Sequence, residues 1–232
     1  FGIAGVLVDP ALTIYQDSKV IATNEGWANN AAITTAAIQT GAFTLASGSK
    51  DAAVLITLNP GAYTATIRGL GGAVGEVLAE IYDVSRNGTR LTNLSTLSRI
   101  NADGDLLIPG IVIAGNNPRS LVIRAVAQGL QTFGYGAADV LGDPRLLVYS
   151  GQTVVTNNNN WAQAGATALT AAFPAVGAFP LTNAADSALL EPLTPGSYTL
   201  QAGATPLTAQ QAAAATAPSQ TGSVLVEIYE IP

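Results

Sequence analysis

The chain repeats the heptapeptide DPALTIY, residues 9–15, as DPRLLVY at residues 143–149. Four more matches keep the same order along the chain: VIATN and VVTNN (20–24, 154–158), GAF twice (41–43, 177–179), PGAYT and PGSYT (60–64, 195–199), GEVLAEIY and GSVLVEIY (75–82, 222–229). These segments are short, rich in β-branched and aromatic residues, and separated by Gly, Pro, Asn and Asp, which is typical of strands and turns. We therefore predict an all-β protein. It should hold two related β-sandwich modules, jelly-roll or immunoglobulin-like, with a shared three-strand segment between them.

The repeat divides the chain into three parts. Residues 1–84 form the first module, residues 133–232 the second, and residues 85–132 lie between them without a counterpart before Phe1. The first module is thus expected to lack its opening strands, whereas residues 85–232 together resemble one full repeat. Strands are expected at 11–15, 19–23, 53–58, 62–68 and 76–83, and in the middle segment at 90–100, 105–113 and 120–126. Short helices or packed loops are expected after both tryptophans. The predicted core consists of Tyr63, Tyr198, Ile81, Ile228, Phe43 and Phe179.

Composition excludes several classes of function. The 232 residues are 48% hydrophobic and 10% charged, against about 25% charged in an average domain. His, Cys and Met are absent, which excludes His-dependent nucleophiles, thiol chemistry and disulfides, and indicates a processed product or a fragment. Ser47 and Lys50 have the spacing of a Ser/Lys acyl-transfer pair but lie in an expected turn. We predict that the protein is not an enzyme and binds no cofactor.

The charges are unevenly distributed. Residues 85–132 carry five basic and two acidic residues, whereas residues 1–84 carry three and seven, and residues 133–232 carry one and six. Complementary charge favours docking of the middle segment on the acidic modules. The net charge of −6 opposes nucleic-acid binding, and no apolar run reaches the roughly 18 to 20 residues of a membrane helix, so no membrane insertion is expected. The low charge instead suggests burial against copies of the chain itself.

The middle segment also carries the motifs of a known repeat. LTNLST at 91–96, GDLLIPGIVI at 104–113 and PRSLVIRAV at 118–126 are followed by the second-module motifs given above. Together they resemble a tandem β-sandwich repeat of large secreted and surface proteins of environmental bacteria, with a looser similarity to pre-peptidase C-terminal domains. The sequence departs from the repeat at residues 127–129, where Ala-Gln-Gly replaces a Gly-Pro-Ser-like turn. The resemblance implies a β-sandwich, an extracellular or cell-surface location and no catalytic residues.

Candidate residues for strand pairing and assembly lie in the middle segment: Arg90, Leu91, Leu94, Leu106, Ile108, Leu121, Ile123 and Arg124. An unpaired strand edge is a liability that native proteins cover, so this segment must pair with something. Glu80 and Glu227 occupy matching positions on expected strands. They could pair with Arg124 or Arg99 at a buried seam, or face solvent.

Three weaker candidate sites remain. Asn101, Asp103 and Asp105 could offer oxygens to Ca²⁺, or form a hairpin turn. The Asn-rich turns beside Trp27 and Trp161 could stack a sugar or be Asx turns closed by a core tryptophan. Asn87 and Asn93 fit the N-glycosylation pattern.

We predict a secreted structural protein whose copies join head-to-tail by strand sharing into an extracellular filament or surface array. A carbohydrate- or Ca-binding accessory module of a larger surface protein is the alternative.

Overall fold

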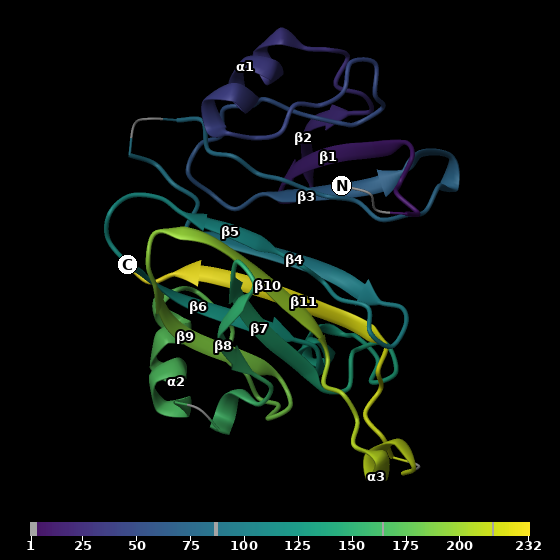
Figure 1. Ribbon diagram of the computed structural model, residues 1–232, viewed down its shortest axis with the longest axis vertical. Helices are drawn as coiled ribbons and strands as arrows, with labels where there is room; N and C mark the ends of the chain where they lie inside the picture. Colours follow the sequence, from purple (N-terminus) through teal and green to yellow (C-terminus); the bar gives the residue numbers. More distant parts are fainter. Residues whose placement is uncertain (1–3, 86–87, 164, 215) are drawn as a thin grey trace. The chain divides into compact units, whose positions relative to one another are not determined.

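The computed structural model describes residues 4–85, 88–163, 165–214 and 216–232 (Figure 1). The chain is mainly β, with three antiparallel sheets and a few short helices. It divides into two compact units, Phe1–Arg90 (unit 1) and Leu91–Pro232 (unit 2). Within the described residues, no helix is long and apolar enough to cross a membrane.

Unit 2 consists of two four-stranded sheets that share one core. The first sheet has the order β5 (Gly110–Ile113), β10 (Gly196–Ala204), β7 (Pro144–Ser150), β8 (Thr153–Asn158). The second has the order β4 (Asn93–Ile100), β11 (Gly222–Glu230), β6 (Arg119–Val126), β9 (Ser187–Leu193). The remaining elements are η2 (Gln128–Phe133), η3 (Trp161–Gln163), α2 (Ala166–Ala175) and α3 (Ala209–Ala212). The three strands expected in the middle segment are confirmed as β4, β5 and β6.

The core of unit 2 follows from the alternation of its strands. Along β7, Leu146 and Val148 are fully buried, and their neighbours are only partly so. β11 alternates in the same way at Val224 and Val226, as expected for a strand with one face against the other sheet. β6 differs, because all six residues from Leu121 to Val126 are buried. It lies in the interior of its sheet, hydrogen-bonded to β11 on one side and β9 on the other.

Unit 1 repeats half of this architecture. Its single sheet has the order β2 (Lys19–Asn24), β1 (Pro10–Gln16), β3 (Thr64–Gly69), which matches the order β8, β7, β10 of unit 2. The register shift between Ile14 and Tyr15 recurs between Val148 and Tyr149. In each unit a helix follows these paired strands. In unit 1 it is α1 (Ala31–Thr40), with Asn30 as its N-cap. The short helix η1 (Leu70–Gly72) follows β3.

The expectation of strands at residues 53–58 and 76–83 is wrong. Neither segment is assigned as a strand, although their counterparts in unit 2 are β9 and β11. In unit 2 both of those strands bond to β6, and within its described residues unit 1 has no strand in the place of β6. A strand pattern without a neighbour to pair with does not form a ladder.

The predicted core is accordingly right in unit 2 and partly wrong in unit 1. Tyr198 and Ile228 are buried, and Phe179 is partly buried. Tyr63 is also partly buried, and its hydroxyl donates to the Asn59 carbonyl at 2.8 Å. The other two are exposed: Ile81 by 57% and Phe43 by 42%.

Candidate strand-acceptor site

Arg124 of β6 is the centre of the polar seam in unit 2. Its side chain has no exposed surface, and its Nε donates to Glu227 Oε2 at 2.9 Å. Its Nη2 donates to the same carboxylate and its Nη1 donates to the Phe179 carbonyl. Register explains the pairing, because Arg124 lies directly opposite Glu227 in the β6–β11 ladder. Of the alternatives left open by the sequence, Glu227 pairs with Arg124, whereas Arg99 donates to the Asp139 carbonyl.

Aromatic rings surround this ion pair. The guanidinium carbon of Arg124 lies 4.2 Å from the ring centroid of Phe179 and 5.0 Å from that of Phe173. Tyr229 donates its hydroxyl to Glu227 Oε1 at 2.5 Å. Burial, together with the bonded Glu227 carboxylate, raises the pKa of Tyr229 well above its usual range. The seam is therefore a desolvated cation held by one carboxylate and by ring faces.

A second carboxylate holds the turn that follows β6. Asp186 Oδ1 accepts from the backbone N–H groups of Ala127 and Gln128 at 2.8 and 2.9 Å, and Oδ2 accepts from Gly129 at 2.9 Å. Asp186 is fully buried, and this burial raises its pKa, against the opposing effect of the three N–H donors and Arg124. A Cβ on Gly129 would lie 2.8 Å from Asp186 Oδ2, so the turn needs glycine there.

Unit 1 keeps the backbone framework around the equivalent carboxylate. Trp27 N donates to the Asp51 carbonyl at 2.8 Å, and Ala53 N donates to Asn24 Oδ1 at 3.0 Å. The same two bonds exist in unit 2: Trp161 N to the Asp186 carbonyl at 2.9 Å, and Ala188 N to Asn158 Oδ1 at 3.1 Å. Asp51 therefore occupies in unit 1 the place of Asp186. Its side chain is exposed and accepts a hydrogen bond from Ser49 Oγ at 2.7 Å.

The segment 76–83 also starts in the same way as β11. Glu76 N donates to Gly5 O at 2.9 Å, and Glu76 O accepts from Leu7 N at 2.8 Å, as Ser223 bonds to residues 139 and 141 in unit 2. A Cβ on Gly75 would lie 2.5 Å from Leu7 N, so this close approach requires glycine. Beyond Glu76 the segment has no strand partner within the described residues, and Leu78 and Ile81 are both 57% exposed.

The polar groups of the seam recur on this open segment. Tyr82 donates its hydroxyl to Glu80 Oε1 at 3.0 Å, as Tyr229 does to Glu227. Glu80 is exposed, and no described Arg or Lys forms an ion pair with it. Residues 53–58, the counterpart of β9, also expose apolar side chains: Leu55, Ile56 and Leu58. Unit 1 thus has both carboxylates and both flanking segments of the seam, but not the strand between them.

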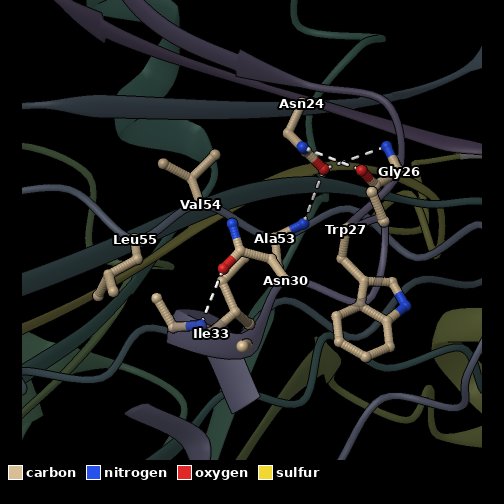
Figure 2. Close-up of a pocket in the computed structure, with 11 residues that line it drawn as sticks. Asn24, Gly26, Trp27, Asn30, Ile33, Ala53, Val54 and Leu55 are labelled. Carbon is tan, nitrogen blue, oxygen red and sulfur yellow. Dashed lines mark hydrogen bonds between the residues drawn. The ribbon is translucent and has the colours of Figure 1, made fainter. Parts of the chain in front are cut away.

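The turns that could stack a sugar use their polar groups internally. A pocket of about 610 Å³ lies beside Trp27. Figure 2 shows that Asn24, which lines this pocket, bonds to Gly26 and Ala53. The Trp27 indole N–H donates to Ser49 Oγ. In unit 2 the Trp161 indole N–H donates to the Asn183 carbonyl. The turn in unit 1 is thus an Asx turn beside a buried tryptophan, and sugar binding at either turn stays a prediction.

The candidate Ca²⁺ ligands lie in the turn between β4 and β5. Asp105 Oδ2 accepts from the backbone N–H of Ala102 at 2.9 Å and of Asn101 at 3.3 Å, and Gly104 has φ +90°. Asp103 is exposed in the same turn. Among the described residues, no group of three or more His, Cys, Asp or Glu side chains is arranged to hold a metal ion.

The candidate strand-pairing residues fall into two groups. Leu94, Leu121, Ile123 and Arg124 lie in the ladders of β4, β11, β6 and β9. Leu106 packs beside Gly203, and Arg90, Leu91 and Ile108 are exposed outside the strands. Of the glycosylation candidates, Asn87 lies outside the described residues. Asn93 is exposed on β4, and its amide donates to the Ile228 carbonyl.

The turn-binding role of Asp186 and its match to Asp51 were not predicted from the sequence. The available signal was their recurrence: DAAVL at residues 51–55 matches DSALL at residues 186–190. No family model matches the chain, and comparison with curated proteins found no similar sequence.

Proposed function

We propose that this protein is a secreted structural subunit of an extracellular filament or surface array, in which unit 1 accepts a β-strand from a neighbouring subunit. One observation carries the proposal. Residues 53–58 and 76–83 have the sequence pattern of β9 and β11, yet they lack the strand that joins those two in unit 2, and their apolar side chains are exposed.

Binding of a strand along residues 53–58 and 76–83 is energetically favourable. Burying a Val, Leu or Ile side chain contributes about 1.5–3 kcal/mol, and several such side chains are exposed on the two segments. An inserted strand would also bond to backbone groups on both sides, which is β-augmentation. Open apolar edges are otherwise sites of indiscriminate aggregation.

The donor is a further strand of the β6 type and not β6 itself. Six consecutive residues of β6 are buried in unit 2. If β6 left unit 2 to pair with unit 1 of a neighbour, it would expose the core of unit 2 that it now covers. Donor and acceptor are different surfaces, so the contact is heterologous, and subunits that carry both propagate it into a fibre unless it closes into a ring. The charged fraction of 10% accords with a subunit covered on several sides.

Amide hydrogen exchange on the full chain tests the proposal, with β9 and β11 of the same molecule as references. In dilute chain, residues 53–58 and 76–83 should exchange much faster than β9 and β11. They should become protected in particles that light scattering and electron microscopy show to be assembled, or when a β6-type peptide is added. Protection equal to that of β9 and β11 in a stable monomer would mean that unit 1 closes on itself, and the proposal would be wrong.

A further inference from the structure

Unit 2 shows how a strand of this type is recognised. Arg124 pairs with Glu227, and the three consecutive N–H groups of residues 127–129 bind Asp186. The two anchors act on one continuous segment, because Gly129 follows Arg124 by five residues. The strand is thus fixed in register by a charge on its side chain and by the backbone of its turn.

Unit 1 has carboxylates at the same two repeat positions, but no strand of the described residues is bound to them. Glu80 and Asp51 match Glu227 and Asp186 in the repeat, and the two carboxylates are exposed. Their supporting bonds are in place, from Tyr82 to Glu80 and from Trp27 to the Asp51 backbone. By their match to Glu227 and Asp186, the two carboxylates mark the positions at which a bound strand would place its arginine and its turn.

The surrounding rings are partly kept as well. Phe43 and Tyr82 of unit 1 match Phe179 and Tyr229, two of the three rings around Arg124. The third ring, Phe173, comes from α2, and α1 contains no aromatic residue. The repeat therefore gives Glu80 the counterparts of two of the three rings that lie around Arg124 in unit 2.

Resting on the function proposed above, we propose that the acceptor site of unit 1 selects a strand with the spacing Arg-x₄-Gly. The arginine pairs with Glu80, the residues before it cover the apolar side chains of 53–58 and 76–83, and the glycine turn donates its N–H groups to Asp51. The partner is thus an apolar polypeptide strand with an arginine five residues before a glycine. A strand that is merely apolar is not enough, because it would bury Glu80 without a cation.

A labelled peptide of residues 117–132, which contains Arg124 and Gly129, is the probe, and fluorescence anisotropy with the full chain is the measurement. The native peptide should bind. Arg124→Leu in the peptide should weaken binding about tenfold or more, as expected for a hydrogen-bonded ion pair. Glu80→Gln in the chain should weaken binding of the native peptide similarly, and it should strengthen binding of the Leu peptide, because it removes the carboxylate that this peptide would bury without a cation.

Asp51→Asn should weaken binding as well, whereas Asp17→Asn serves as a control, since Asp17 lies in the β1–β2 turn. Equal binding of the native and Leu peptides would overturn this inference, because the site would then recognise only the apolar residues of a strand. The proposal that unit 1 accepts a strand would still stand. Failure of the native peptide to bind, with residues 76–83 still protected on assembly, would also overturn the inference but not the proposed function.

Discussion

Replacing Arg124 by Met should strongly destabilise unit 2. The methionine fits the volume of the aliphatic stem, but it leaves the carboxylate of Glu227, which is 5% exposed, without its cation. The loss includes the hydrogen bonds to Glu227 and to the Phe179 carbonyl. Breaking a buried ion pair from one side costs about 3–5 kcal/mol, because the remaining charge stays desolvated.

The double variant Arg124→Met, Glu227→Gln separates charge from packing. The neutral amide of Gln keeps an oxygen that accepts from the Tyr229 hydroxyl, so it removes the buried charge without leaving that donor unpaired. We expect the double variant to recover about half or more of the lost free energy of unfolding, since removing both ions of a buried pair is often nearly neutral.

Each unit contains one of the chain's two tryptophans, so the unfolding of each unit can be followed separately by tryptophan fluorescence. In a Trp27→Phe background, urea unfolding followed by fluorescence reports on Trp161, whose ring lies 6.0 Å from that of Phe173 beside Arg124. In a Trp161→Phe background, the same measurement reports on unit 1. There Glu80→Gln should change the free energy of unfolding by less than about 0.5 kcal/mol, because Glu80 is exposed. A cost below about 1 kcal/mol for Arg124→Met, or above that value for Glu80→Gln, would refute the comparison of the two units.

Three further predictions concern the seam. Burial raises the pKa of Tyr229 above its value of about 10 in the unfolded chain. The neutral phenol therefore stabilises unit 2 fully below about pH 10, and this stabilisation decreases as the pH rises further. Unfolding at alkaline pH should show the decrease, and Tyr229→Phe should abolish it. Asp186→Asn should lower the free energy of unfolding in urea by about 1–3 kcal/mol, because an amide N–H₂ cannot accept hydrogen bonds from the turn. Asp51→Asn in unit 1 should change it little. Equal effects of the two substitutions would contradict the assigned roles. Gly222→Ala should lower the melting temperature of unit 2, because its Cβ would lie 2.3 Å from the Val140 carbonyl carbon; an unchanged melting temperature would contradict this.

Local sequence was sufficient to predict the strands that pair within their own hairpin. The segments around residues 9–24 and 143–158 were predicted correctly, because turn residues and alternation set both partners at once. Residues 76–83 and 222–230 have nearly the same pattern, yet only the second is a strand. The difference is β6, which is distant in sequence from β11, so no window around residues 76–83 could reveal that its partner is missing.

The polar seam could be predicted only in part. The sequence named Arg124 and Glu227 as possible partners but left Arg99 and solvent as alternatives, because strand register decides the pairing. The role of Asp186 depends on the backbone conformation of residues 127–129, which have no strong turn signature. Its recurrence as Asp51 was the one signal available from sequence.

The two acidic anchors of the proposed strand-binding site would also keep the apolar face of unit 1 from joining other surfaces indiscriminately. If the open faces of two copies met, Glu80 and Asp51 of each would be buried near the same residues of the other, with no cation between them. Burying unpaired carboxylates costs several kcal/mol per ion, which opposes this contact. A strand with an arginine in register removes the penalty at Glu80, and the N–H groups of a glycine turn remove it at Asp51. If unit 1 binds the strand proposed above, the same side chains disfavour the wrong partner and favour the right one, and specificity comes from two carboxylates on a face whose apolar contacts would accept almost any strand.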